Sequence, residues 1–435
     1  MGYTRDLLDR PIIGICYAAG GFNNCRRQVP ELVRAVERGV LAAGGLPVAF
    51  PTISLGEVYL APTSLKYRNL MSMDVEEMLR AQPMDAAVLV GGCDKTVPAQ
   101  LMGAASAGVP VVQLVVGSMM TAAHHGERLG ACTDCRRYWA RFRAGDVGQE
   151  EIDLVESRLA TTAGTCAVMG TASTMAVVAE ALGMMPAGAA APPAPDAERL
   201  RVAERSGRLA MQLVGSDRTP ARIITEKSLE NALRVLLAVG GSTNAVIHLA
   251  AIAGRLGVRI DLELLNTLSQ TTPLLVDLKP SGDYYMEDFA AAGGVPAVMH
   301  ELRELLHLDC LTVSGETMGE RLAATLPWTD RNEIRSAAAP LQPEGGLIAL
   351  FGSLAPRGAI VKRSAADPPC SSVGRGASSS TRPTTSRPGS TIPTPMSPLR
   401  MRSCSRTPGR RARPPCRKRA TFQSLGSSRR SGSRI

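Results

Sequence analysis

Three cysteines stand in short loops that contain glycine or asparagine: Cys25 in GFNNC, Cys93 in GGCDK and Cys166 in AGTC. Three thiolates that converge from separate loops suit an iron–sulfur cluster with one open iron, or a catalytic zinc ion. Spacing alone leaves both kinds of site open, together with the simpler interpretation of three buried, inert thiols. The three positions are therefore candidate metal ligands.

A second cysteine pattern is the pair Cys132 and Cys135, a CxxC motif. A single CxxC pair with no second pair nearby is weak support for a zinc ribbon, and no thioredoxin-like pattern surrounds it. In a reducing compartment, spaced cysteines more often bind a metal or react than form disulfides. The loop cysteines, rather than this pair, therefore carry the metal hypothesis.

Alternating strands and helices surround Cys93. A helix-like segment at 73–83 precedes the apolar strand 86–90, and a helix with Pro98 in its first turn leads to a second apolar strand at 109–117. This alternation predicts an α/β fold in which helices cover a parallel sheet. The GGCDK segment then lies just past the carboxyl end of a strand, where open α/β sheets bind their ligands.

Two glycine-rich segments repeat this pattern farther along the chain. Residues 161–185 predict a loop followed by a helix at 172–183, and residues 238–257 predict a Gly-Gly turn with Ser242 as the helix cap. Exposed amides at such a helix start bind carboxylates or phosphates, which makes Ser242 and Thr243 candidate substrate contacts. A plain capped core helix is the alternative.

The five histidines divide into two groups. His124 and His125 occupy a loop after a strand end, followed by glycine, so His125 is a candidate substrate contact. The other three, His248, His300 and His307, lie in apolar or amphipathic segments, and structural roles are expected for them.

Two domains are expected before the composition changes. Residues 1–342 predict a large α/β domain, and the short strands and turn signals of 343–367 indicate the start of a β-barrel-like domain. No apolar run reaches the roughly 18 residues that a membrane span needs, and the charged N-terminus is not typical of a signal peptide. These features predict a cytoplasmic protein without a membrane partner.

The composition changes abruptly after Asp367. The next 68 residues contain 15 Lys or Arg and no Asp or Glu, and 52 of them are Ser, Pro, Arg, Thr or Gly, which is typical of disorder. Residues 1–367 hold 34 basic and 39 acidic side chains, so the net charge of +10 arises from segment 368–435. One interpretation is a basic arm that binds nucleic acid, although Phe422 is its only aromatic residue.

The favoured interpretation of 368–435 is a gene read out of frame. Read one base earlier, a permitted back-translation of Ser403–Ser424 gives VLFQNAGPTSPSAMPEAGYLPI, and the stretch from Cys370 permits LFERGTG. The longer string has the composition of an ordinary globular protein. The slip would then lie near Asp367–Pro369.

Five long motifs together resemble the dihydroxy-acid and sugar-acid dehydratase family, from about Gly2 to Asp367. They are FPTISLGE, VGGCDKTVPAQLMGAASAGVP, AGTCAVMGTASTM, VGGSTNAVIHLAAIAG and MEDFAAAGGVP. The back-shifted text is similar to that family's C-terminal domain, and AGTCAVMGTASTM resembles the sugar-acid (aldonate) branch more than the branched-chain amino-acid branch. The resemblance implies a hydro-lyase that converts a 2,3-dihydroxy acid into a 2-keto acid.

The resemblance also implies two metal centres. An iron–sulfur cluster, 2Fe–2S in preference to 4Fe–4S, would be held by Cys25, Cys93 and Cys166. A divalent cation, usually Mg²⁺, would be held by Glu57, Asp94 and a carbamylated Lys95, whose added carboxylate suits Mg²⁺. The open iron would act as a Lewis acid on the leaving hydroxyl, while the cation would bind the substrate carboxylate and the C2 oxygen.

Two departures from the family pattern bear on activity. Arg26 stands where His or Asn is common, and CYAAGGF at 16–22 replaces an Asn-Thr-x-Ser run. The family's remaining cation ligand, a Glu, and its Ser base belong to the C-terminal domain, and here that Glu arises only in the shifted frame, from the bases of Arg417 and Lys418. We therefore expect the chain as written to be inactive.

The expected partners are a small-molecule 2,3-dihydroxy acid and further copies of the chain, as a dimer or tetramer, with no specific nucleic acid. Three alternatives stay open. They are a dihydroxy-acid dehydratase of branched-chain amino-acid biosynthesis, a nucleic-acid-binding protein that uses its basic tail, and a product that folds without catalysing a reaction.

Overall fold

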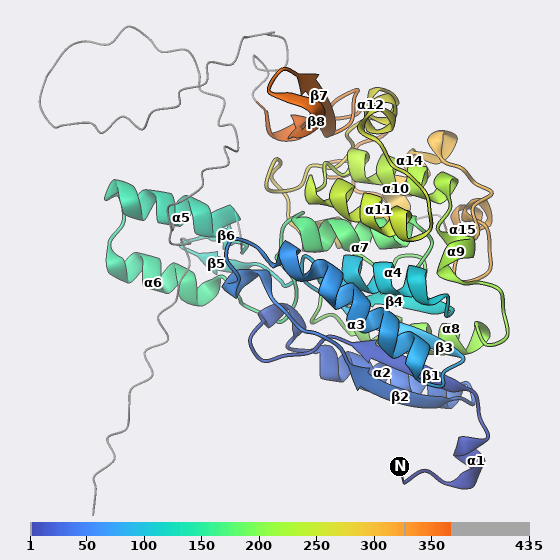
Figure 1. Ribbon diagram of the computed structural model, residues 1–435. Helices are drawn as coiled ribbons and strands as arrows, with labels where there is room; N and C mark the ends of the chain where they lie inside the picture. Colours follow the sequence, from blue (N-terminus) through green and yellow to red (C-terminus); the bar gives the residue numbers. More distant parts are fainter. Residues whose placement is uncertain (1, 132, 326–327, 367–435) are drawn as a thin grey trace, which may run out of the picture. The chain divides into compact units, whose positions relative to one another are not determined.

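The computed structural model describes residues 2–131, 133–325 and 328–366. A four-stranded sheet lies between helices in the blue and teal part of the ribbon (Figure 1). Residues 1–366 form one compact unit. Cys132 and the segment 368–435, with the expectations of disorder and of an out-of-frame origin, lie outside the described residues.

The sheet is parallel throughout, with the strand order β2-β1-β3-β4. Its strands are β1 (Ile12–Tyr17), β2 (Leu46–Pro51), β3 (Ala86–Gly91) and β4 (Val111–Val115). Every residue of β3 is buried, as expected of a parallel strand covered on both faces. The predicted α/β fold with a parallel sheet is confirmed.

Helices cover both faces of the sheet. Helices α2 (Val29–Ala42) and α8 (Ala197–Gln212) pack together on one face, and α3 (Arg68–Ala81) packs with α4 (Thr96–Ala107) on the other (Figure 1). A further layer lies over α4, built from α7 (Thr171–Ala181), α10 (Glu226–Ala238) and α11 (Asn244–Arg255). Because α4 and α7 lie between layers, nearly every residue of both helices is buried, and neither shows a polar face.

The strand order reverses at β1. The chain passes from β1 through α2 to β2 on one side, and β3 then pairs with the other side of β1. Such a reversal leaves a crevice at the carboxyl ends of the two central strands, where open α/β sheets bind ligands. The loops that follow β1 and β3 therefore occupy the favoured position for a site.

An arm of two helices and a hairpin is inserted between β4 and α7 (Figure 1). It contains β5 (Ala122–His124), β6 (Glu127–Leu129), α5 (Thr133–Ala144) and α6 (Gln149–Arg158). Its own small core joins Leu129 of the hairpin to Tyr138 of α5 and to Ile152 and Val155 of α6. The arm is thus a substructure with its own packing.

The short strands expected after residue 343 form an antiparallel hairpin, β7 (Leu347–Gly352) and β8 (Ala355–Lys362), which packs on α12 (Leu262–Thr271). The larger β-barrel-like domain stays a prediction. The remaining helices are α1 (Arg5–Leu8), α9 (Pro220–Ile223), α13 (Met286–Ala291), α14 (Gly294–Glu301) and α15 (Met318–Ala324). Within the described ranges, no helix combines the length and the apolarity that crossing a bilayer demands.

Candidate active site

Two of the three candidate cysteines meet at the carboxyl ends of neighbouring strands. β1 leads to the 3-10 helix η1 (Asn24–Arg26), which carries Cys25, and β3 ends two residues before Cys93. Both residues are buried, with 8% and 4% of their surface exposed, and their thiols hydrogen-bond to each other. The sheet thereby joins two residues that are far apart in the sequence.

The glycines before Cys93 are required by close packing. A Cβ atom at Gly91 would overlap the side-chain oxygen of Gln100, and one at Gly92 would overlap Val116. Cys93 itself has a φ of 80°, a left-handed conformation that costs a non-glycine residue on the order of 1 kcal/mol or more. Glycine would adopt this conformation with less strain, so the presence of a cysteine here indicates that the thiol side chain is needed.

The two thiols differ in acidity. The hydrogen bond that Cys25 donates lowers the pKa of Cys93 to about 6, with a further contribution from the backbone of Glu57. The same hydrogen bond, together with burial, raises the pKa of Cys25. By contrast, burial raises the pKa of Cys16 to about 12 and that of Cys310 to about 11. Because the thiolate is the metal-binding and nucleophilic form, Cys93 is prepared for either role.

The loop of Cys166 is bonded to the loop of Cys25. The Gly164 amide donates to the Asn24 carbonyl at 3.3 Å, and the Asn24 side chain donates to the Thr162 carbonyl at 2.7 Å. Cys166 lies beside this contact and is partly exposed. The three predicted ligand loops thus adjoin one another, since Cys93 touches Cys25.

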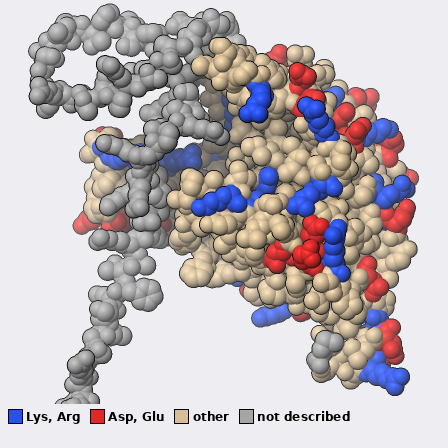
Figure 2. All heavy atoms as spheres, in the orientation of Figure 1, with Lys and Arg blue, Asp and Glu red and all other residues tan. Residues whose placement is uncertain are grey.

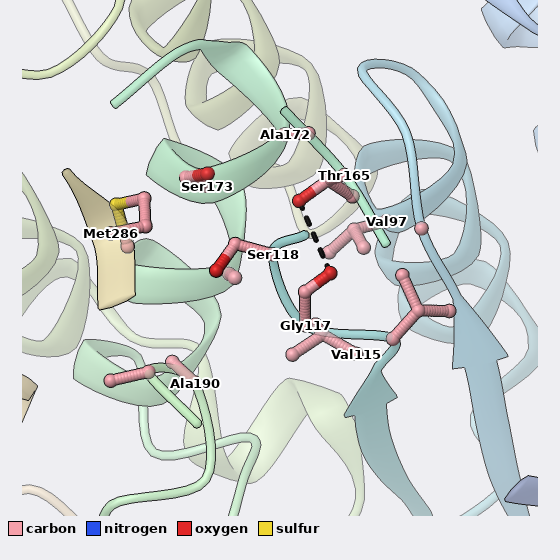
Figure 3. A pocket seen from close by; sticks show the side chains of 13 residues that line it. Val97, Val115, Gly117, Ser118, Thr165, Ala172, Ser173, Ala190 and Met286 are labelled. Carbon is pink, nitrogen blue, oxygen red and sulfur yellow. Dashed lines mark hydrogen bonds between the residues drawn. The ribbon is translucent and has the colours of Figure 1, made fainter. Parts of the chain in front are cut away.

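A small pocket lies beside these loops, lined by Gly92, Ser118 and Thr165 among others (Figure 3). Thr165 Oγ1 donates to the Gly117 carbonyl at 3.3 Å, whereas the buried Ser118 hydroxyl has no partner among the described residues. Sequence reasoning missed Ser118. Ser118 could have been identified from its position, because it is the first residue with a hydroxyl group after the buried strand β4.

Two carboxylates converge on a buried lysine next to Cys93. Lys95 Nζ lies 3.2 Å from Asp94 Oδ2 and 3.5 Å from Glu57 Oε2, and only 2% of the Lys95 side chain is exposed. Glu57 begins the 3-10 helix η2 (Glu57–Tyr59) after β2, and its Oε2 also accepts hydrogen bonds from the amide and hydroxyl of Ser64. The structure therefore brings the three predicted cation ligands together.

The two carboxyl groups have opposite pKa shifts. Burial raises the pKa of Asp94, and the attraction of Lys95 offsets only part of this effect. Burial also acts on Glu57, but hydrogen bonds from Ser64 and Thr63 outweigh it and lower its pKa. Burial destabilises the charged form of Asp94, and Lys95 offsets only part of that cost, so a nearby metal cation would further stabilise the carboxylate.

Arg26 is a site residue whose role the sequence did not reveal. It is 1% exposed and donates to four acceptors, Gly92 O at 3.3 Å, Ser54 Oγ at 2.5 Å, Leu55 O at 2.6 Å and Thr96 Oγ1 at 2.5 Å. These acceptors belong to the segments after β2 and β3, so one guanidinium fixes the Glu57 loop to the Cys93 loop. Its departure from the family pattern was the visible signal.

The remaining predicted contacts lie in two places. Ser242 Oγ lies 2.8 Å from Thr171 Oγ1 at the start of α7, and it accepts from the Asn244 amide at 3.3 Å. Thr243 directly precedes the first residue of α11 but makes no side-chain cap bond, so the capping hydroxyl is that of Ser242, as predicted. His125 lies on the arm, where it contacts neighbouring arm residues. Substrate contact by these residues stays a prediction.

The other histidines have structural surroundings. His248 is fully buried in α11, and its Nδ1 lies 2.7 Å from Arg68 Nη1. His300 bonds to a main-chain carbonyl, and His307 Nε2 lies 2.8 Å from Glu230 Oε2.

Comparison with known proteins matches the sequence of this chain to one family. The sequence model described as dihydroxy-acid/6-phosphogluconate dehydratase, N-terminal, matches residues 10–321. An L-arabinonate dehydratase of Rhizobium leguminosarum is 44% identical over 370 residues, covering 84% of this chain and 64% of that protein.

Two further relatives differ in their named substrates. A 6-deoxy-6-sulfo-D-gluconate dehydratase of Pseudomonas putida is 40% identical, covering 84% of this chain and 63% of the relative. A dihydroxy-acid dehydratase of Syntrophobacter fumaroxidans is 38% identical, covering 85% of this chain and 67% of the relative. The chain thus spans slightly less than two thirds of the length of the most similar of these proteins.

Proposed function

The chain belongs to the dihydroxy-acid/6-phosphogluconate dehydratase family, and on this premise we propose that its site is built to dehydrate a 2,3-dihydroxy carboxylic acid to a 2-keto acid. The observation that carries the proposal is the convergence of Glu57, Asp94 and Lys95 beside the paired thiols of Cys25 and Cys93. Family membership alone does not require these side chains to meet.

The cysteine loops fit an iron–sulfur cluster. Cys25 and Cys93 have touching thiols, one of them with a lowered pKa, and the loop of Cys166 is bonded to the Cys25 loop. Thiolates are the ligands that such clusters use. We assign the three cysteines as the residues that would hold the cluster, 2Fe–2S in preference to 4Fe–4S.

The carboxylates fit a divalent cation such as Mg²⁺. Oxygen ligands from Glu57 and Asp94 suit that ion, and carbamylation of Lys95 would replace the ammonium between them with a third carboxylate. Bound together, the two centres would supply Lewis-acid activation of the leaving hydroxyl and a clamp for the substrate carboxylate. The protein's own part is to hold these donors close together on loops that follow the parallel strands.

A sugar acid of the aldonate type is the proposed substrate. Two of the relatives described above carry names of sugar-acid dehydratases, and these share 44% and 40% identity against 38% for the dihydroxy-acid dehydratase. Ser242 and Thr243, at the start of α11, are the proposed polar contacts for the sugar acid. A cytoplasmic location and a homo-oligomeric state complete the proposal.

Turnover by the frame-corrected protein tests the reaction. That protein is incubated with Mg²⁺ and a panel of aldonates that includes L-arabinonate, and in parallel with 2,3-dihydroxyisovalerate, and 2-keto acids are measured. We expect a 2-keto-3-deoxy acid from an aldonate. Turnover of dihydroxyisovalerate alone would instead place the chain in the branched-chain amino-acid branch, and no turnover of any substrate would refute the proposal.

The metal assignment has a separate test. Protein purified without oxygen should show an iron–sulfur absorption spectrum, and Ser in place of Cys25, Cys93 or Cys166 should remove most of the bound iron. Replacement of Cys135, or of Cys132, is the matched control and should leave the iron content unchanged. Equal iron in all variants would contradict the assignment.

The nucleic-acid alternative depends on the basic segment 368–435, which lies outside the described residues, so it stays a prediction. On the face shown in Figure 2, basic and acidic side chains are interspersed and form no continuous basic stripe.

A further inference from the structure

A cluster of two histidines and one glutamate lies on the arm, outside the site described above. His124 Nε2 lies 2.6 Å from Glu151 Oε1, and His125 Nε2 lies 3.5 Å from Glu151 Oε2. The three potential ligand atoms all fall within 4.8 Å of one another. We propose that His124, His125 and Glu151 form a zinc site that links the β5–β6 hairpin to α6.

The donor set and spacing suit zinc. Two imidazoles and one carboxylate are a recurrent ligand set for this ion, with a fourth position left to water. Tetrahedral zinc with bonds of about 2.1 Å separates its ligand atoms by about 3.4 Å. His125 Nε2 already lies at this spacing from Glu151 Oε2, and the 2.6 Å distance from His124 Nε2 to Oε1, the other oxygen of the same carboxylate, would open by less than an ångström.

The backbone of the hairpin turn supports a role for His125. His125 and Gly126 have φ values of 48° and 82°, so both central residues of a two-residue turn are left-handed. Asn-Gly and Gly-Gly are the usual pairs in such a turn, because they adopt this conformation with least strain. The histidine instead places its ring 4.1 Å from that of His124.

Burial divides the three ligands into a fixed one and two accessible ones. His124 is 1% exposed and packs edge-on against Tyr138 of α5, whereas the side chains of His125 and Glu151 are 74% and 27% exposed. A metal ion can therefore reach the cluster from solvent and find one imidazole already oriented.

Binding through Nε2 of His124 would move the ring proton to Nδ1. The 3.4 Å contact of Nδ1 with Arg158 would then be lost, but Arg158 would keep its 3.0 Å hydrogen bond to the Ala123 carbonyl. Forming the site would thus cost the 2.6 Å hydrogen bond between His124 and Glu151, which zinc ligation replaces, and the long hydrogen bond to Arg158.

Zinc titration of the chelator-stripped full chain, with Mg²⁺ present, tests the proposal. His125→Asn is the most informative variant, because asparagine supports the left-handed turn while removing a ligand. Glu151→Gln keeps an acceptor for His124 but binds zinc weakly. Glu150→Gln, one position earlier and exposed, is the control. We expect the first two variants to bind one zinc ion at least tenfold more weakly than the parent, and the control to match the parent.

Cobalt in place of zinc separates this site from the cysteines. The ion lost in His125→Asn should show ligand-field bands without a thiolate-to-cobalt charge-transfer band, because its ligands are nitrogen and oxygen. Equal affinity in the parent and both ligand variants, a loss of binding in Glu150→Gln as well, or a thiolate band from the lost ion would each overturn the proposal.

Discussion

His248 is a histidine that the fold keeps neutral. Burial, with smaller contributions from the positive charges of Arg68 and Lys95, lowers its pKa to about 3. Its Nδ1 faces the guanidinium of Arg68, and its Nε2 is buried without a partner among the described residues. Protonation would therefore place an unpaired charge in the core.

This residue should make stability depend on pH. The folded pKa of His248 lies below the unfolded value of 6.5. Above pH 6.5 the histidine is neutral in both states and does not lower the free energy of unfolding. As pH falls from 6.5 toward 3, only the unfolded state takes up the proton, so the free energy of unfolding decreases. Between pH 7 and pH 5 the free energy of unfolding should fall by about 2 kcal/mol on account of this group. Denaturant unfolding of His248→Gln should lack that decrease. His307→Gln, at a partly exposed histidine, is the control, and an unchanged slope in His248→Gln would contradict the prediction.

Arg26 acts at the scale of elements, because it joins the segments that follow β2 and β3. In Arg26→Gln, the carbonyls of Gly92 and Leu55 would lose their donors, and the free energy of unfolding should fall by about 2 kcal/mol. Arg26→Lys should retain only part of this stability, because a single ammonium group cannot reach all four acceptors at once. Denaturant unfolding measures both changes.

Arg27, the exposed neighbour of Arg26, provides the control. Arg27→Gln should change the free energy of unfolding by less than about 0.5 kcal/mol, and a loss as large as that in Arg26→Gln would argue against a specific role for Arg26.

The elements differ in how far their sequences determine them. The run 86–90 predicted β3 to within one residue, because a buried parallel strand is uniformly apolar. The strand predicted at 109–117 is shorter, since β4 ends at Val115 and Gly117 turns with a φ of 84° against Pro192 and Ala194. No local pattern encodes that tertiary contact.

The arm and the site show the same limit. The polar helix α5 has no long apolar stripe, so the sequence did not predict the arm. Cys25, Cys93 and Cys166 were identified by resemblance and by loop position, whereas the bridging role of Arg26 depends on contacts between residues up to 70 positions apart. Residue types can be read locally, but such contacts exist only in the folded chain.

At the scale of the whole molecule, we predict that the segment 368–435 determines whether the chain is active. It contains no Asp or Glu, so it offers no carboxylate as the further cation ligand that the family resemblance implies. We predict that the chain as written does not turn over an aldonate, while the frame-restored protein does, because removal of the C2 proton needs a positioned base. Parallel 2-keto acid assays of both proteins measure this difference. Comparable rates in the two would refute the prediction, and resequencing the DNA around codons 365–371 is its independent check.

The wide spacing of the three cysteine loops has a consequence for how a cluster would be delivered. Long chain segments separate Cys25, Cys93 and Cys166, and bringing the ends of such segments together costs several kcal/mol of conformational entropy. The pairing of strands β1 and β3 in the parallel sheet, rather than metal binding, offsets this cost. The ligands therefore come within reach of one another only after the sheet has formed. Unlike a zinc finger, which folds around its ion, this chain should bring its three cysteine loops together first and accept a cluster as a folded protein.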